Sequence, residues 1–237
     1  TPALKLTGGL RRQQTDVAVE EFKGIPGGKN DYQSTLGNLS ALYDYRNGHQ
    51  NWLRFSQGVE VPDPAKYYGR AGVTVAANPL SAIATDQVEL GWRFGDRRWT
   101  TQAALYYAWS DKALEFNSAD LSIDVIDQRK RDYGLELAST RRFDNGVEVG
   151  GTLHQVRSEQ KNDAGEWEKR DARYASLSSA TAFAGWRAGP RAVRLQANHA
   201  FDLNDDGNRQ IDGYTTVDTV LSQQTRIGRF AFGVQNL

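Results

Sequence analysis

The sequence predicts an all-β fold, specifically an antiparallel transmembrane β-barrel portion, and three observations support this prediction. Apolar and polar side chains alternate along most of the chain, as expected where successive strand residues point to opposite faces of a sheet. Short turns and long loops alternate between the strands, as in outer-membrane barrels with short periplasmic turns and long outer loops. Aromatic residues flank the short turns, and a soluble sandwich has no reason to repeat them at one end only.

The clearest segment is Thr85–Ser110, which contains two alternating strands joined by a tight turn. Trp99 and Trp109 lie ten residues apart on the apolar face of the second strand. That spacing is roughly 33 Å along a strand, or roughly 24 Å of height at a tilt of about 40–45°, close to the apolar band of an outer-membrane barrel. We expect Leu90, Trp92, Leu105, Tyr107 and Trp109 to face lipid, and Gln87, Glu89, Arg93, Gln102 and Tyr106 to face the lumen.

The same pattern predicts about eleven strands along the chain. They are Ala3–Val19, Tyr32–Tyr45, Trp52–Val61, Thr85–Phe94, Trp99–Phe116, Ile123–Phe143, Val147–Ser158, Ala180–Trp186, Ala192–Leu203, Gly213–Gln224 and Phe230–Leu237. The short connections carry Asn-Gly, Gly-Asp or Gly-Pro turn residues. The aromatic residues beside these short connections are Tyr45, Trp52, Phe94, Trp99, Phe143, Trp186 and Phe230. In the strand Ala180–Trp186, Phe183 is out of phase with Trp186.

Composition excludes several other classes of protein. The 237 residues carry 29 basic and 29 acidic side chains. The chain therefore lacks the excess of positive charge that would indicate nucleic-acid binding. Cysteine is absent, which excludes disulfides and thiolate metal sites. No apolar run reaches helical transmembrane length, and the first ten residues, TPALKLTGGL, do not form a signal peptide. The mean hydropathy of −0.64 is compatible with a barrel, because half of each strand faces water inside.

Seven segments carry a resemblance to a known family. They are GIPGGKNDY at Gly24–Tyr32, FSQGVEVPDPAKYYG at Phe55–Gly69, TDQVELGWR at Thr85–Arg93, SDKALEF at Ser110–Phe116, YGLELAS at Tyr133–Ser139, DGYTTVDTVLS at Asp212–Ser222 and FGVQNL at Phe232–Leu237. Together they resemble TonB-dependent outer-membrane receptors for ferric siderophores, in family order along nearly the whole chain. Within that family they are most similar to receptors for citrate-hydroxamate siderophores of the ferric-aerobactin type.

The resemblance implies a 22-stranded barrel that holds an N-terminal plug domain, in the bacterial outer membrane. It implies a receptor that binds and imports a ferric siderophore, with iron entering only as the siderophore complex and no resident cofactor or metal. The implied partners are the siderophore, outer-membrane lipid and lipopolysaccharide, and TonB acting through a plug region that this sequence lacks; nucleic acid is not among them. Residues 1–237 are therefore expected to be a partial receptor β-barrel domain, without the plug and the terminal strands.

The tract Pro62–Arg70, PDPAKYYGR, is the leading candidate for substrate contact. A ferric siderophore of citrate type is anionic and has flat faces, so basic side chains suit its charge and tyrosines suit its faces. The predicted substrate-binding residues are Lys66, Tyr67, Tyr68, Arg70 and the lumen-facing Tyr106. The structural alternative for the tract is an aromatic girdle and a loop anchor at the outer rim.

Three other segments have competing interpretations. The charges of Glu159–Ser179 nearly cancel, which favours a solvated, mobile loop over a binding loop. The basic run Gln128–Asp132 could pair with lumen carboxylates, with lipopolysaccharide phosphates or with substrate. DLNDDGNRQIDG at Asp202–Gly213 has oxygen-bearing residues at the spacing of a calcium loop, but Gly213 stands where the bidentate Glu belongs. An Asx-rich turn is the favoured interpretation of this last segment.

The chain shows no catalytic motif. Its three histidines, His49, His154 and His199, have no obvious Ser or Asp partner nearby in sequence, and no nucleophile elbow occurs. We therefore expect no catalytic residues and no enzyme. The alternative to a siderophore receptor is a passive outer-membrane pore or an adhesive barrel without energised transport.

Overall fold

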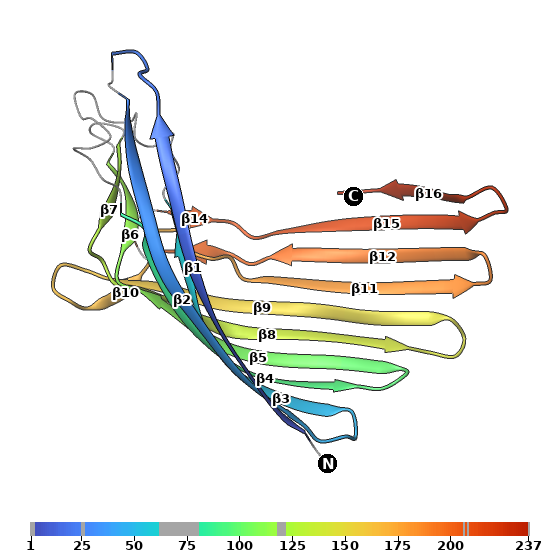
Figure 1. Ribbon diagram of the computed structural model, residues 1–237. Coiled ribbons are helices and arrows are strands. Elements are labelled where there is room, and N and C mark those ends of the chain that lie inside the picture. Colours follow the sequence, from blue (N-terminus) through green and yellow to red (C-terminus); the bar gives the residue numbers. More distant parts are fainter. Residues whose placement is uncertain are drawn as a thin grey trace.

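The computed structural model describes residues 3–24, 27–61, 81–117, 122–205, 207 and 209–236. In these residues the fold is all-β, and its main element is one antiparallel sheet of 12 strands with the order β1-β2-β3-β4-β5-β8-β9-β11-β12-β15-β16 and with β10 paired to β9 (Figure 1). The main-sheet strands are β1 (Leu4–Val19), β2 (Gly28–Asp44), β3 (His49–Glu60), β4 (Ile83–Gly95), β5 (Trp99–Ser110), β8 (Lys130–Arg142), β9 (Val147–Lys161), β10 (Trp167–Lys169), β11 (Ser179–Ala188), β12 (Arg191–Ala200), β15 (Tyr214–Gln224) and β16 (Arg229–Val234). Within the described part of the chain, no helix has the length and apolar character needed to cross a membrane.

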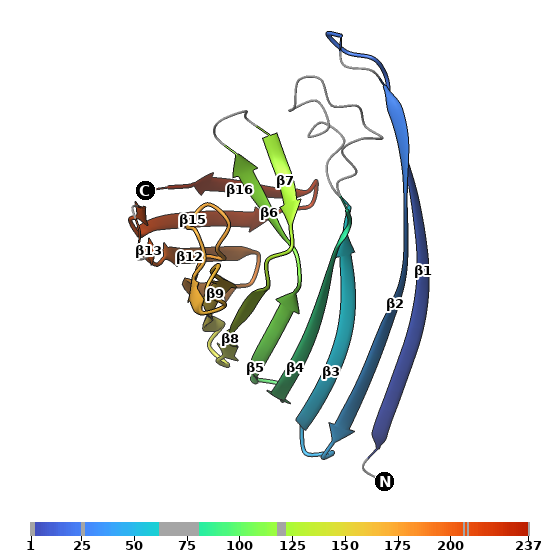
Figure 2. The same cartoon turned by 90° about the vertical axis from the view of Figure 1, so that its left-hand side faces the viewer.

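The sheet curves into an open half-cylinder, and its connections differ in length between the two ends (Figures 1 and 2). Tight turns join β2 to β3, β4 to β5, β8 to β9, β11 to β12 and β15 to β16 at one end, the short-turn rim. Two small hairpins lie at the other end, the loop rim: β6 (Ala113–Asn117) with β7 (Ser122–Ile126), and β13 (Leu203–Asn204) with β14 (Gln210–Ile211). The predicted separation of short turns from long loops is confirmed.

Two predicted strands were too long. Trp99–Phe116 divides into β5 and β6, and Ile123–Phe143 divides into β7 and β8, because β6 and β7 leave the main sheet and pair with each other. The break follows Ser110, which is buried and whose hydroxyl donates to the Lys112 carbonyl at 3.2 Å and accepts from the Lys112 amide at 3.4 Å. These local hydrogen bonds turn the chain out of the sheet while apolar alternation continues.

The register gives the main sheet two distinct faces. Leu53, Leu90, Leu105 and Leu135 stand directly opposite one another on four neighbouring strands and form one apolar row. Leu90 and Leu105 expose 54% and 57% of their surface, so no described part of the chain covers this face, which we call the outer face. Glu89 and Tyr106 are paired on the opposite, inner face. The predicted division of β4 and β5 into two sets of residues on opposite faces is confirmed.

An aromatic cluster marks the outer face at the short-turn rim. The rings of His49 and Phe94 lie 4.6 Å apart, and those of Phe94 and Trp99 lie 5.6 Å apart. The Trp99 indole donates to the Ser139 hydroxyl at 3.0 Å, and the Trp92 indole donates to His49 Nδ1 at 3.2 Å. Amphipathic rings gather at membrane–water boundaries in barrels, so this part of the predicted girdle is confirmed.

Trp52 does not belong to that girdle. It pairs with Gly91 in the register, and its indole lies on the inner face, where its N–H donates to the Glu89 carboxylate. Tyr106 and Phe183 likewise stand opposite the glycines Gly134 and Gly150 on the inner face. A Cβ on Gly150 would come within 2.6 Å of the Phe183 ring, so the glycine is what lets the ring lie over the neighbouring strand. Phe183 and Trp52 therefore face inward, each opposite a glycine. This explains why Phe183 is out of phase with Trp186, and why the prediction that placed Trp52 in the girdle was wrong.

Candidate functional site

The candidate site is the polar inner wall of the half-cylinder together with its loop rim. Four of the five predicted substrate-binding residues, Lys66, Tyr67, Tyr68 and Arg70, lie outside the described residues. The fifth, Tyr106, lies on the inner face, as its position in the alternation predicts. The inner wall is therefore the part of the predicted site that the structure describes.

Tyr106 joins a polar centre on that wall. Its hydroxyl shares a hydrogen bond of 2.8 Å with His154 Nε2, and the two rings stack with centroids 5.9 Å apart. The strand between them presents Gly134, and a Cβ there would come within 2.9 Å of the Tyr106 hydroxyl. Glu136, on the same strand, stands opposite His154 in the register. The partner of His154 lies 48 residues earlier in the chain, so no local sequence signal indicates this contact.

Above this centre, the loop between β10 and β11 is attached to the wall at Ser158. The Ser158 carbonyl accepts from the Arg170 amide at 3.1 Å, and its hydroxyl accepts from the Ser176 amide at 3.0 Å and donates to the Asp132 carboxylate. The Arg170 guanidinium lies 3.9 Å from Asp132, with 12% of its side chain exposed. Burial lowers the pKa of Arg170, and the carboxylates of Asp132 and Glu60 oppose that shift. The part of the loop after β10 is thus packed on the wall, contrary to the solvated loop expected from its charge balance, whereas residues 163–168 are exposed as expected.

Asp205 connects this loop to the one between β12 and β15. One carboxylate oxygen accepts from the Ala172 amide at 3.2 Å, and the other accepts from the Gly207 amide at 3.0 Å. In the same second loop, Asp202 accepts from the Gly213 amide at 2.5 Å. The bond from the Gly207 amide to Asp205 is that of an Asx turn, the interpretation that the sequence favoured for this segment.

The Asp205 contact between the two loops should depend on pH. Hydrogen bonds from the backbone amides of Gly207 and Ala172 lower the pKa of Asp205 below 3.8. The stabilisation that the ionised carboxylate provides is therefore complete above pH 3.8, and it is lost as the pH falls through the lower pKa of the folded state. The measurement is hydrogen exchange of the Ala172 amide in the full-length receptor, corrected for intrinsic exchange rates. Protection of this amide should be constant above pH 3.8 and should decrease below that pH. Asp205→Asn should give weaker protection with no such pH dependence. An identical pH profile in both proteins would exclude this role.

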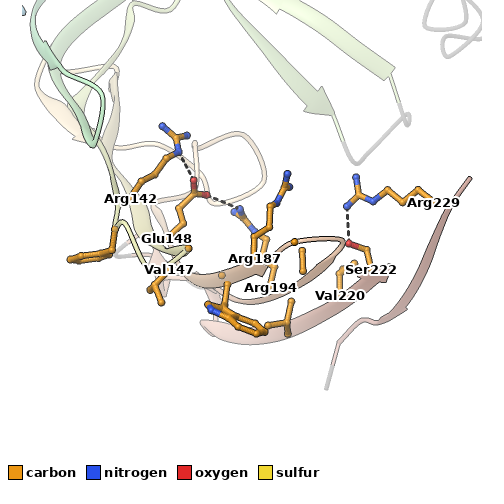
Figure 3. Close-up of a pocket in the computed structure, with 15 residues that line it drawn as sticks. Arg142, Val147, Glu148, Arg187, Arg194, Val220, Ser222 and Arg229 are labelled. Carbon is orange, nitrogen blue, oxygen red and sulfur yellow. Dashed lines mark hydrogen bonds and ion pairs between the residues drawn. The ribbon is translucent and has the colours of Figure 1, made fainter. Parts of the chain in front are cut away.

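A second feature of the inner wall is a basic cavity of about 830 Å³ near the short-turn rim. Its lining includes four arginines and one glutamate: Arg142, Arg187, Arg194, Arg229 and Glu148 (Figure 3). The Glu148 carboxylate lies 2.7 Å from Arg142 Nε and 3.8 Å from Arg194 Nη1, while Arg229 donates to the Ser222 hydroxyl at 3.1 Å. The excess of positive charge makes this cavity complementary to anionic groups.

The sequence analysis missed this cavity. Its arginines come from β8, β11, β12 and the start of β16, so they lie far apart in the sequence and form no motif. The available signal was positional, because each of these residues lies on the inner-face parity within a few residues of a short turn. Arg194 also lies over the Phe183 ring, with its guanidinium carbon 3.8 Å from the ring centroid.

Comparison with known proteins agrees with this architecture. A family model described as TonB dependent receptor-like, beta-barrel, matches residues 1–237. The ferric aerobactin receptor of Klebsiella pneumoniae is 37% identical over 98% of this chain and 36% of its own length. The rhizobactin receptor of Rhizobium meliloti (strain 1021) is 34% identical over 92% of this chain and 33% of its own length.

A solved structure shows the same fold. The ferric yersiniabactin uptake receptor of Yersinia pestis superposes with a TM-score of 0.73, covering 99% of this chain and 38% of that structure at 22% identity. This chain therefore spans about a third of the length of the relatives that it matches. The family match over the whole chain, the identity to receptor sequences and the two-faced antiparallel sheet lead to one conclusion: the chain belongs to the TonB-dependent receptor β-barrel family.

Proposed function

We propose that this chain forms part of the barrel wall of a TonB-dependent receptor in the bacterial outer membrane, which binds and imports a ferric siderophore of the hydroxamate or citrate class. The observation that carries the proposal is the 37% identity, over 98% of the chain, to a protein named as a ferric aerobactin receptor. The two faces of the sheet support it, because an apolar outer face suits lipid and a polar inner face suits a lumen.

The proposed substrate-binding residues are Lys66, Tyr67, Tyr68, Arg70 and Tyr106. Lys66 and Arg70 would meet the negative charge of the iron chelate, and the tyrosines would meet its flat faces. Tyr106 is held by His154 on the inner wall, where a ligand entering from the loop rim would pass it. Iron is cargo in this proposal and arrives as the siderophore complex, so the protein holds no cofactor of its own.

The proposed partners follow from the same placement. TonB would act through a plug region outside this sequence, and the outer face would contact outer-membrane lipid and lipopolysaccharide. Nucleic acid has no place among the partners, since the chain has equal numbers of acidic and basic residues. We propose no catalytic role for any residue.

Siderophore affinity should fall when the proposed binding residues are truncated in the full-length receptor. Because a charge-assisted contact contributes about 1.5–3 kcal/mol, Lys66→Ala and Arg70→Ala should each weaken equilibrium binding roughly tenfold or more. Tyr68→Ala and Tyr106→Ala remove the aromatic part of the site. Arg97→Ala, in the exposed turn after β4, is the matched control and should bind as the wild type does. Wild-type affinity in all four site variants, at normal abundance in the membrane, would refute the assignment.

A passive pore or an adhesive barrel is the alternative function. Uptake of the iron-loaded siderophore by cells that produce the full-length receptor separates the two. Import that stops when TonB is deleted or the proton gradient is collapsed supports the receptor, whereas import that continues without both supports the pore. Binding without any import would favour an adhesive barrel.

A further inference from the structure

The basic cavity of Figure 3 carries more positive charge than its own lining neutralises. Glu148 is the one carboxylate among the described lining residues, and it already pairs with Arg142 and Arg194. In the part of the chain that the structure describes, Arg187 and Arg229 have no carboxylate at ion-pair distance. The charge of the cavity therefore favours a ligand that carries negative groups.

Small residues in the sheet give this cavity its floor. Gly185 stands between Glu148 and Arg194 in one row of the register, and Ala192 pairs with Ser222 in the next row towards the rim. The arginine side chains thus surround a part of the wall that has no bulky side chain. The resulting volume of about 830 Å³ lies within the range of about 300–1,000 Å³ that is usual for small-molecule sites.

Arg194 is held in position before any ligand arrives. Its guanidinium lies over the Phe183 ring, its Nη2 donates to the Gln196 side-chain oxygen at 3.1 Å, and its Nη1 faces Glu148. The side chain still exposes 45% of its surface to the lumen. A guanidinium has five N–H donors, so donors remain for a carboxylate of the ligand. Because the group is already ordered, binding costs less entropy.

The cavity is separate from the predicted contact at Tyr106. Tyr106 stands opposite Gly134 on β8, and Arg142 lies on the same face of β8 eight residues further towards the short-turn rim. That spacing is roughly 26 Å along the strand. A small chelate that contacts Tyr106 therefore does not reach the cavity, and the inner wall offers two positions, one nearer to each end of the lumen.

We propose that the basic cavity is a second site for the ferric siderophore, which binds the carboxylates of the iron chelate at the short-turn end of the lumen before the chelate is released. Arg187 and Arg194 are the contacting cations. This inference rests on the proposed function and adds a position to the import path. The substrate of that function is anionic and has to travel along this wall from the loop rim to the short-turn rim. The strand ladders keep the arginines in place while other parts of the lumen move.

The test uses the full-length receptor, with iron-labelled ferric aerobactin as the probe because a relative is named as its receptor. Arg187→Gln and Arg194→Gln should each lower the maximal import rate about tenfold, the size of one charge-assisted contact. Equilibrium affinity, measured in cells without TonB, should stay at the wild-type value, since the predicted outer contacts are untouched. Arg194→Lys should lose less import, because it keeps the charge.

The matched control is Arg93→Gln. Arg93 is also an inner-face arginine close to a short turn, but it lies outside the cavity and donates to the Gln50 side chain at 2.5 Å. Its substitution should leave both import and affinity unchanged.

An acidic surface of a plug would meet the same arginines, and a leak measurement separates the two ligands. Entry of a bulky hydrophilic antibiotic into cells without TonB reports a loosened plug. Slower import with normal affinity and no leak supports the second site. Wild-type import in both glutamine variants would overturn it, and so would a leak, which would assign the arginines to the plug. A wild-type receptor that imports no ferric siderophore would refute the proposed function and the second site with it.

Discussion

Arginine at position 105 is expected to cost about 2–4 kcal/mol of barrel stability in a bilayer. Leu105 lies on the outer face between Leu90 and Leu135, and 57% of its surface is exposed to whatever surrounds the barrel. If that environment is the middle of the hydrocarbon layer, a guanidinium there has no water and no protein partner. The effect is read from the free energy of unfolding of the full-length receptor in lipid vesicles.

Gln102 is the matched control for this substitution. It lies on the inner face of the same strand, three residues from Leu105, and pairs with Arg93 and Ala138. Gln102→Arg should cost less than about 1 kcal/mol, since the lumen is wet and the repulsion from the neighbouring Arg93 is screened there. Equal losses at positions 102 and 105 would contradict the assignment of the two faces.

The separation of two faces could be predicted from the sequence, because it follows from the strict two-residue period of side chains on a strand. Residues that are paired in the register face the same side of the sheet. A correct assignment of inner and outer residues on β4 and β5 therefore also assigns the residues of the neighbouring strands. Apolar alternation by itself cannot show where a strand leaves the sheet. The break after β5 depends on hydrogen bonds at Ser110, and the β6–β7 hairpin continues the same alternation beyond it.

The site was less predictable, because its members meet only through the register. Tyr106 could be placed on the inner face, but its contact with His154 requires β8 to lie between β5 and β9 with a glycine at the crossing point. The arginines of the cavity in Figure 3 come from separate strands and share no motif. The binding roles of residues 66 to 70 remain a prediction.

The aromatic girdle shows how one pattern can hide two structural roles. Trp99 and Trp52 both stand next to short turns, and the sequence places them together. The register separates them, since Trp99 faces outward beside Phe94 while Trp52 faces inward opposite Gly91. A glycine in the partner strand is the signal that distinguishes the two, because a flat ring can lie across the neighbouring strand only where no Cβ intervenes.

Alanine at position 91 should therefore destabilise the barrel through a single clash. A Cβ on Gly91 would overlap the Trp52 indole, and the ring would have to leave its place and give up its hydrogen bond to Glu89. Forcing such a shift costs about 1–3 kcal/mol in a packed site. Gly58→Ala is the control, because the nearest atom to a Cβ at that position is the Thr85 carbonyl oxygen at 3.9 Å. We expect its effect to stay within about 0.5 kcal/mol.

A double-mutant cycle on positions 52 and 91 tests whether the indole is the cause. In a Trp52→Ala background the space above residue 91 is empty, so Gly91→Ala should lose most of its cost there. The coupling energy between the two substitutions should then be about 1–3 kcal/mol, measured as free energies of unfolding of the full-length receptor in vesicles. Additive effects would mean that the clash of Gly91→Ala lies with the backbone rather than with Trp52, and that the inward indole does not depend on the glycine opposite it.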